Sequence, residues 1–296
     1  MNILELKQDM RSLHNKDIGW CYYNHSVVPT TAPHEEPDLS PIEDGSIWHI
    51  DGQKPLFVRY TTDWDCGFDT GWWYVIKDAP FDIESLSKSS RKHIRSALRK
   101  VRVERINPSE HFSELFECYK QACQKYKLAD NLFSFESFQK YYINAEAEKI
   151  AFWAGFSMQD NKLVGYMTVK QNQCWSEICA AKFDPRFLNL QISDALYASV
   201  LDYYLNKQGN KYISSGSRSI NHLTNTQEYK EQHFNYRKCY CRLNIVYRPD
   251  VKKIVKILYP LRYIINLLGR FSGVFHQISG VLTMESIVRK NPRTSV

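Results

Sequence analysis

The residues best suited to chemistry lie where a predicted strand meets a predicted helix, within residues 174–194. The strand is expected to run to about Phe183, and an amphipathic helix is expected to begin near Leu190. The first backbone N–H groups of a helix have no partner inside the helix, so this junction suits an anion such as a cofactor pyrophosphate. Lys182 and Arg186 add positive charge at the same place. The junction is therefore the candidate binding site for a phosphate-bearing ligand.

A second group of charged side chains forms a basic stripe on a predicted helix over residues 87–100. The stripe consists of three arginines that recur every four residues, Arg91, Arg95 and Arg99. Residues at this spacing share one helix face, and here they lie beside an apolar stripe. Such a face either is simply solvated or docks a phosphate-bearing partner such as RNA, a nucleotide or lipid headgroups.

The elements that position these residues follow in a regular order. A strand is expected at 101–106, helices at 109–127 and 134–147, and a hairpin at 150–171. After the junction come a short strand at 211–214, a helix near 225–232 and a long strand at 237–247. Three consecutive strands between helices indicate an α/β (α+β) fold, with a mixed, mostly antiparallel sheet flanked by helices, rather than a doubly wound sheet.

The chain is expected to have three parts. Residues 1–85 predict a small, mainly β half-domain with strands at 46–50, 55–61 and 72–77, residues 86–248 the main domain, and residues 249–296 C-terminal helices. Tyr23 belongs to an aromatic-rich segment of the first part. Such a segment can line a substrate pocket or fill a core.

Two short motifs carry a resemblance to a known superfamily. The order of elements and Tyr229-Lys-Glu-Gln-His-Phe234 resemble the GNAT superfamily of acyl-CoA N-acyltransferases, whose last helix often ends Tyr-x-x-x-Gly-Phe; His233 replaces that glycine. Residues 91–99 resemble a helix that precedes the GNAT-like domain in the branch that includes the peptidoglycan-bridge aminoacyl transferases. Together these likenesses cover about residues 85–247. They imply a GNAT-like fold and the transfer of an acyl group to an amine.

The junction loop departs from the GNAT pattern. Acetyl-CoA-dependent GNAT enzymes usually carry Gln/Arg-x-x-Gly-x-Gly/Ala, whose glycines let the backbone approach the pyrophosphate. Here the loop reads Arg186-Phe-Leu-Asn189-Leu-Gln191: the arginine fits, Asn189 can adopt unusual dihedrals, and Gln191 does not fit. The peptidoglycan-bridge branch also lacks this loop and uses a charged tRNA. The donor therefore stays open between acyl-CoA or acetyl-CoA, an acyl carrier protein and an aminoacyl-tRNA. The resemblance implies donor-binding residues Lys182, Phe183, Arg186, Asn189 and Gln191.

The resemblance also implies roles in the reaction. Tyr229 would protonate the leaving group, with a core tyrosine as the alternative. Glu177 lies in the middle of the strand that lines the site in this fold, where a carboxylate could accept the amine proton; a surface position is the alternative. Substrate-binding residues are expected where the next strand ends, at Ser214, Ser215 and Arg218, together with Tyr23 of the first part. The expected acceptor is a small-molecule or lipid-linked amine, such as that of a cell-envelope or polysaccharide precursor.

Other chemistries fit the residue spacing poorly. The segment Asp63–Asp69 has its glycine one place too early for a calcium loop, and Tyr74 stands where a bidentate Glu is required. The eight cysteines form no Cys-x-x-Cys pair and have no histidine at zinc-finger spacing, so no metal is expected. The first residues lack the apolar run of a signal peptide, and no stretch reaches the ~18 apolar residues of a membrane span. Reduced cysteines in a cytoplasmic protein are expected.

The net charge of +7 is concentrated in the basic helix and in the tail. Residues 251–284 contain no Asp or Glu and carry a helical apolar stripe that Pro260 interrupts. A basic amphipathic helix with aromatic residues is typical of a segment lying on an anionic membrane, here the cytoplasmic face. Packing against the main domain or a second subunit is the alternative.

Two functions of different classes follow. The first is an N-acyltransferase, favoured by Tyr229 and by the polar residues after 211–214. The second is a non-catalytic, degenerate GNAT-like module that binds RNA or an anionic membrane through the basic helix and the tail. The missing loop glycines favour this second function.

Overall fold

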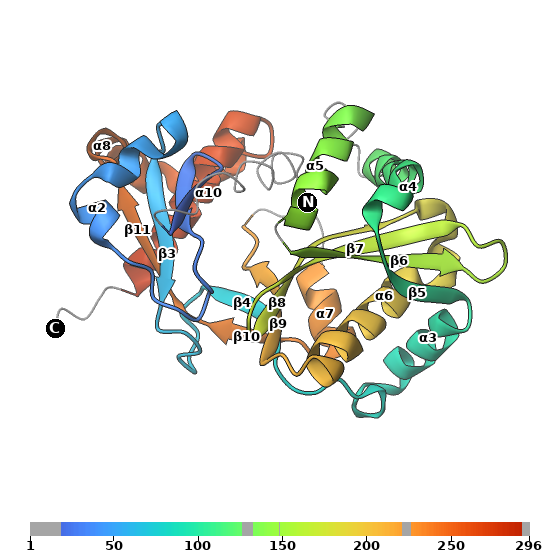
Figure 1. Ribbon diagram of the computed structural model, residues 1–296. Helices are drawn as coiled ribbons and strands as arrows, with labels where there is room; N and C mark the ends of the chain where they lie inside the picture. The colour runs from blue at the N-terminus through green and yellow to red at the C-terminus, as the bar shows by residue number, and fades with distance from the viewer. Residues whose placement is uncertain (1–18, 126–132, 148, 221–225, 292–296) are drawn as a thin grey trace. The chain divides into compact units, whose positions relative to one another are not determined.

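The computed structural model describes residues 19–125, 133–147, 149–220 and 226–291 (Figure 1). The chain packs as two compact units. Unit 1 comprises Met1–Tyr74, Ser217–Thr224 and Cys239–Val296, and unit 2 comprises Val75–Gly216 and Asn225–Lys238. The expected three domains, with boundaries after residues 85 and 248, stay a prediction.

Unit 2 is built on most of a mixed sheet of strand order β10-β4-β9-β8-β7-β6-β5. Its strands are β4 (Trp73–Lys77), β5 (Val101–Ile106), β6 (Ile150–Ser157), β7 (Leu163–Gln171), β8 (Trp175–Phe183), β9 (Tyr212–Ser217) and β10 (Arg237–Tyr240). The pairs β5–β6, β6–β7 and β7–β8 are antiparallel, and β9 is parallel to β8. The predicted mixed, mostly antiparallel sheet is confirmed.

Helices cover both faces of this sheet, α4 and α5 on one face and α3, α6 and α7 on the other (Figure 1). The helices are α3 (Lys88–Leu98), α4 (Phe112–Lys125), α5 (Phe135–Ala147), α6 (Ile192–Leu201) and α7 (Thr226–Phe234). Short helical turns are η2 (Ile83–Ser85), η3 (Pro108–Glu110), η5 (Pro185–Leu190) and η6 (Asp202–Lys207), the last a π-helical continuation of α6. The Ser87 side chain accepts a hydrogen bond from the Ser90 N–H and caps α3.

The approach of α6 to the sheet depends on a pair of glycines. Gly155 and Gly165 face each other on β6 and β7. A Cβ atom at Gly165 would lie 2.6 Å from Ile192 Cγ2, which is closer than two carbon atoms can pack. These glycines therefore let the first turn of α6 press directly onto β7.

Unit 1 contains a second sheet of order β1-β2-β3-β11. Its elements are β1 (Trp20–Tyr23), β2 (Ser26–Pro29), α2 (Ser40–Glu43), η1 (Ser46–Gly52), β3 (Phe57–Thr62), β11 (Arg242–Tyr247), α8 (Pro249–Leu258), η7 (Tyr259–Leu261), α9 (Arg262–Leu268) and α10 (Gly273–Lys290). The strand predicted at 46–50 is wrong. This segment is a 3₁₀ helix whose buried Ile47 and Ile50 are three residues apart, the period of that helix.

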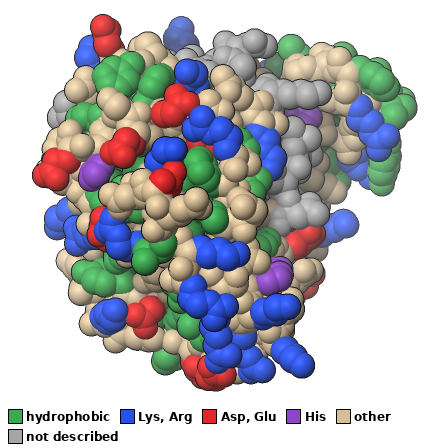
Figure 2. Space-filling view, turned by 90° about the vertical axis from the view of Figure 1, so that its right-hand side faces the viewer, with side chains coloured by type: hydrophobic (Ala, Val, Ile, Leu, Met, Phe, Trp, Pro, Cys, Tyr) green, Lys and Arg blue, Asp and Glu red, His purple; other side chains and the backbone are tan. Residues whose placement is uncertain are grey.

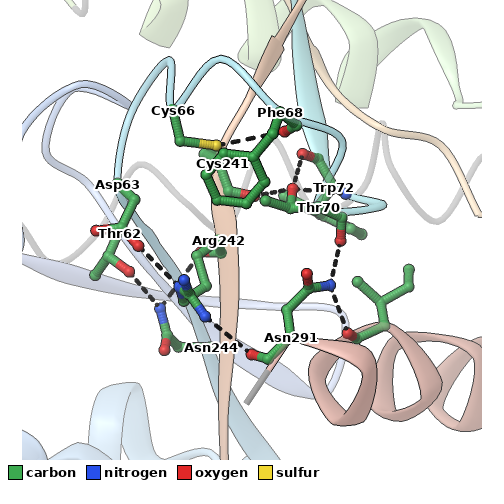
Figure 3. Close-up of polar contacts among 11 residues, drawn as sticks. Thr62, Asp63, Cys66, Phe68, Thr70, Trp72, Cys241, Arg242, Asn244 and Asn291 are labelled. Carbon is green, nitrogen blue, oxygen red and sulfur yellow. Dashed lines mark hydrogen bonds and ion pairs between the residues drawn. The ribbon is translucent and has the colours of Figure 1, made fainter. Parts of the chain in front are cut away.

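The long strand predicted at 237–247 is two strands, β10 and β11, in different sheets. The break is at Cys241, whose N–H donates to the Trp72 carbonyl oxygen and whose carbonyl oxygen accepts from the Thr70 hydroxyl at 2.6 Å (Figure 3). Arg242 follows and donates to Asp63 Oδ2 at 2.8 Å and to the Asn291 carbonyl oxygen at 3.1 Å. These bonds hold β11 against β3 and the end of α10.

Candidate functional site

Strands β8 and β9 separate soon after they begin. Their parallel register joins only Trp175–Glu177 to Tyr212–Ser214, although both strands continue. Opposite Thr168 and Val169 of β7, strand β8 carries one extra residue, Cys179, as a β-bulge. Bulges increase local strand twist and are common beside active sites. The carboxyl ends of β8 and β9 therefore diverge, and the ends of parallel strands are where α/β folds bind ligands.

The junction loop after β8 is held by its own charges. The buried Asp184 accepts hydrogen bonds from the backbone N–H of Arg186 at 2.9 Å and from its guanidinium at 2.5–3.0 Å. Glu117 of α4 lies 3.7 Å from the same guanidinium. Arg186, predicted to bind donor phosphate, is thus already paired with two carboxylates. Gln191 follows at φ 59°, ψ 44°, in the left-handed region, and α6 begins at the next residue.

Of the other predicted donor-binding residues, Lys182 and Phe183 point to opposite faces of β8. Lys182 is buried against α4, where Cys118 contacts its carbonyl oxygen. Phe183 lies on the α6 face, next to Gly165. Asn189 is exposed, and the Gln191 side-chain oxygen is buried without a hydrogen-bond partner among the described residues.

Glu177, the predicted base, lies on the α4 face of the sheet. The register pairs it with Lys170 of β7 and with Ser214 of β9, so these three side chains share a face. Desolvation raises the pKa of Glu177, and the Lys170 charge opposes that rise. Ser215, the next residue of β9, points to the α6 and α7 face instead. The structure therefore separates Glu177 from Tyr229 by the thickness of the sheet.

Tyr229 of α7 bonds to the start of α6. Its hydroxyl donates to Asp194 Oδ1 at 2.8 Å and lies 3.1 Å from the Ser193 hydroxyl oxygen. Burial raises the pKa of Tyr229 well above its ordinary value, and the Asp194 charge raises it further. Burial also raises the pKa of Asp194. The Tyr229 hydrogen bond and the electrostatic interactions with His233 and His93 oppose this rise. A phenol and a carboxylate thus share one buried hydrogen bond between two helices.

We call Tyr229, Asp194, Lys230 and Ser215 the cluster. Lys230, the residue after Tyr229, is its most unusual group. It is 7% exposed, and its ammonium donates to the Ser215 hydroxyl at the end of β9. The ammonium also lies 5.7 Å from the centre of the Tyr197 ring. No carboxylate is bonded to it among the described residues. Burial lowers the pKa of Lys230 to about 8.

Two histidines border the cluster. The His233 ring lies 4.6 Å from that of Tyr229 and stacks on His93 of α3 at 6.3 Å. His233 Nδ1 is buried and has no hydrogen-bond partner among the described residues. His233, which stands where the GNAT motif has a glycine, therefore places an aromatic ring beside Tyr229.

The remaining predicted substrate residues lie elsewhere. Arg218 belongs to unit 1, where its guanidinium stacks over Trp73 at 4.6 Å and donates to the Gly71 carbonyl oxygen. Tyr23 also belongs to unit 1, at the end of β1 in the β1–β2 hairpin, and is half-buried. Of the predicted residues, only Tyr229 and Ser215 belong to the cluster with Lys230.

Sequence reasoning missed Asp194 and Lys230. Asp194 lies in the first turn of a predicted helix, where an acid is an ordinary helix-stabilising residue. Lys230 follows Tyr229 in a helix rich in polar residues, where a lysine is normally exposed. The spacing along the helix could have revealed that Lys230 is buried. Lys230 is four residues before the buried Phe234, so the two side chains share one face of the helix.

The cluster combines groups with distinct proton preferences. Tyr229 stays protonated, whereas Lys230 can be an ammonium or a neutral amine near neutral pH. General acid–base catalysis is most efficient when the pKa of the catalytic group lies near the working pH. Lys230 therefore has the properties of a proton donor or of a cation that stabilises a developing negative charge.

Comparisons with known proteins bear on the fold. No protein-family model matches the chain, and no curated protein matches it. A crystal structure of FemX matches at TM-score 0.57 and 8% identity, covering 82% of this chain and 84% of that one. The C-terminal domain (DUF2156) of a putative lysylphosphatidylglycerol synthetase from Agrobacterium fabrum matches at TM-score 0.51 and 11% identity, covering 78% and 81%. The chain has a GNAT-like fold, similar to the folds of FemX and of this synthetase domain.

Proposed function

We propose that a protein with this GNAT-like fold uses unit 2 to transfer an acyl or aminoacyl group to an amine, with Lys230 as the central catalytic residue. The observation that carries the proposal is the buried Lys230, whose pKa is lowered to about 8 and which bonds to Ser215 where β9 parts from β8. The likeness to FemX and to a lysylphosphatidylglycerol synthetase domain supports this class of reaction.

In the proposed reaction an amine nitrogen attacks the carbonyl carbon of an ester or thioester. The new C–N bond forms, the C–O or C–S bond breaks, and the leaving oxygen or sulfur takes a proton. The Lys230 ammonium stabilises the negative charge that develops on oxygen and supplies the proton. Its lowered pKa makes it a stronger acid than an exposed lysine. The amine must lose one proton, and water is proposed to take it. Glu177, the base predicted from the sequence, lies on the face of the sheet opposite Lys230 and Ser215 and does not fit this step.

Tyr229 stays a candidate acid, but its surroundings favour a positioning role. Giving up its proton would leave a phenolate next to Asp194, in a place where burial already disfavours negative charge. A tyrosine held to α6 by Asp194 instead fixes the orientation of α7. Because Lys230 is the adjacent residue, this hydrogen bond also fixes the direction of the ammonium.

The donor is proposed to be acyl-CoA or another polyanionic carrier. The junction loop disfavours acyl-CoA and so favours the other carrier. Arg186 is paired with carboxylates and the loop has no glycine, so it offers little to a pyrophosphate. On α3, Arg91 and Arg95 bond to Glu84, while Lys88, Lys92 and Arg99 are exposed. Figure 2 shows the side of the molecule that is on the right in Figure 1, where α3 lies near the bottom. Lys and Arg side chains gather on the lower part of this side. A carrier such as charged tRNA fits this surface.

The proposed acceptor is an amine of a cell-envelope or polysaccharide precursor, reached from the cytoplasmic face of a membrane. The basic tail at 251–284 supports that location. Among the described helices, none has the length and apolar character needed to cross a bilayer.

The test is a transfer assay with radiolabelled acetyl-CoA, longer acyl-CoAs and a mixture of aminoacyl-tRNAs, each with amine acceptors. We expect one donor to support turnover. Lys230→Met should abolish turnover, and Lys230→Arg should retain a low residual activity. Lys211→Met is the matched control, because Lys211 is exposed immediately before β9, and should retain full activity. If Lys230→Met turns over as fast as wild type, the proposal is wrong.

The second candidate function is a non-catalytic module that binds RNA or an anionic membrane. The glycine-free loop and the paired Arg186 favour it. Thermal-shift measurements with the same donors distinguish the two functions. Stabilisation by tRNA without turnover of any donor would support the binding module.

A further inference from the structure

Helices α8, α9 and the start of α10, all in unit 1, carry apolar side chains on two sides. On the inner side Val255, Ile265 and Leu282 form a small core. On the outer side lies what we call the apolar ridge, with Tyr263 72% and Phe271 83% exposed. The ridge consists of Ile257, Tyr263, Ile264, Leu267, Phe271 and Val274. Most of the exposed large hydrophobic side chains of the described residues lie between Ile254 and Phe275. Such a concentration of exposed apolar side chains marks a contact surface.

Positive charge surrounds the ridge and negative charge is absent from it. Lys252, Lys253 and Lys256 on α8 are exposed and form no ion pair among the described residues. Arg262 stacks on Tyr259 at 4.6 Å and on Tyr263 at 4.3 Å, at the foot of the ridge. Residues 251–284 contain no acidic side chain. The partner is therefore apolar in its interior and anionic at its surface.

Next to the ridge, a cavity of about 400 Å³ opens between α8 and α10. Its walls include the rings of Tyr247 and Tyr259 and the cationic side chains of Lys252, Lys256 and Arg289. The one carboxylate in the wall, Glu285, is already bonded: the Tyr247 hydroxyl donates to it at 2.9 Å and Arg289 Nε at 2.7 Å. Two lysines are left to attract an anion.

We propose that this surface docks on an anionic phospholipid bilayer, with the apolar ridge in the boundary between headgroups and acyl chains and a lipid phosphate in the cavity. A membrane accounts for both features at once, because its surface is anionic and its interior apolar. A second copy of this chain fits poorly, since a two-fold contact through the ridge would bring two sets of lysines together. RNA would match the lysines but not the ridge. This inference does not depend on the transfer reaction.

The test is flotation of the full chain with two kinds of vesicle, pure phosphatidylcholine and a mixture of phosphatidylcholine with phosphatidylglycerol. We expect flotation with the mixed vesicles at low salt, weaker flotation at high salt, and little with the neutral vesicles. Lys252→Gln with Lys256→Gln should lower the partition coefficient about twenty-five-fold, since each lysine near an anionic surface contributes about fivefold. Ile264→Asn with Phe271→Asn should lower it by at least tenfold.

Matched controls separate docking from a general change of charge or polarity. Lys54→Gln with Lys140→Gln removes the same charge at exposed positions elsewhere, and Phe68→Asn with Met158→Asn removes exposed apolar groups elsewhere. Both should float like wild type. All substituted side chains are exposed, so far-ultraviolet circular dichroism should show each variant folded.

The proposal is overturned if the chain stays in solution with the mixed vesicles at low salt, or if the tail variants float like wild type. It is also overturned if sedimentation shows a ridge-dependent dimer that does not bind vesicles. Glycerol phosphate serves as the soluble probe: it should compete weakly, because a free phosphate does not engage the ridge. Strong competition would identify a site for a free phosphate ester instead. Transfer to a soluble amine should be unchanged in the tail variants, so failure of docking and failure of the transfer reaction are distinguishable.

Discussion

Lys230→Met should make the protein more stable at neutral pH while abolishing transfer. Burial lowers the pKa of Lys230 from 10.5 to about 8, which corresponds to about 3 kcal/mol of unfavourable charge burial. Methionine has a similar length and no charge, so the variant avoids this penalty. It also loses the hydrogen bond to Ser215, worth about 1 kcal/mol. The expected net gain in the free energy of unfolding at pH 7 is about 2 kcal/mol.

The sign of the pH dependence follows from proton binding. The unfolded lysine keeps its proton up to about pH 10.5 and the folded lysine only up to about pH 8. Between these values the unfolded state binds more protons, so wild-type stability rises with pH. The advantage of Lys230→Met is therefore full below about pH 8 and fades as pH approaches 10.5.

Urea denaturation of both proteins at pH 7 and near pH 10 measures this difference. Lys211→Met, at an exposed position, is the control and should differ from wild type by less than about 0.5 kcal/mol at either pH. A Lys230→Met variant that is less stable than wild type at pH 7 would refute the reasoning. So would a gain that is the same at both pH values, because that gain could not come from the lysine charge.

Three further predictions concern the packing around the cluster. Tyr229→Phe should cost about 1–3 kcal/mol of stability because it leaves the buried Asp194 without its hydrogen-bond donor. Urea denaturation should show that most of this cost disappears when Asp194 is also replaced by Ala. An equal cost in the Asp194→Ala background would contradict the pairing of Tyr229 with Asp194. Gly165→Ala should cost about 1–3 kcal/mol because its Cβ would lie 2.6 Å from Ile192 Cγ2. Thermal unfolding should show this cost reduced in an Ile192→Ala background, and an unreduced cost would mean that another atom meets the methyl group. Gln191→Gly should raise the free energy of unfolding by up to about 1 kcal/mol, since glycine adopts the left-handed region without strain. Gln191→Val should lower it in the same urea titration, and the reverse order would contradict the backbone assignment.

The elements of unit 2 could be predicted because their patterns are local. The apolar periodicity of α3, α4 and α6 and the hairpin of β6 and β7 depend on residues close in sequence. The division of residues 237–247 into two strands could not be predicted in this way. Its cause is the bonding of Cys241 to Thr70 and Trp72, which lie far away in the chain. An uninterrupted β pattern does not reveal which sheet each half joins.

The candidate site could be predicted only in part, for a related reason. Tyr229 was found through a motif, but its partner Asp194 comes from another helix. Lys230 has a lowered pKa because Ser215 and Tyr197 enclose it, and both come from other elements. Glu177 was placed correctly on its strand, whereas the face it points to depends on the register with β7, which a single sequence does not specify.

The interleaving of the two units has a consequence for how the chain is made. The backbone crosses between the units after Tyr74, Gly216, Thr224 and Lys238, so neither unit is one continuous segment. During synthesis β3 leaves the ribosome early, but its partner β11 follows only after nearly all of unit 2 has been made. One edge of β3 must therefore wait unpaired, exposed to wrong partners. An expression fragment of residues 75–216 would likewise lack α7, and with it both Tyr229 and Lys230.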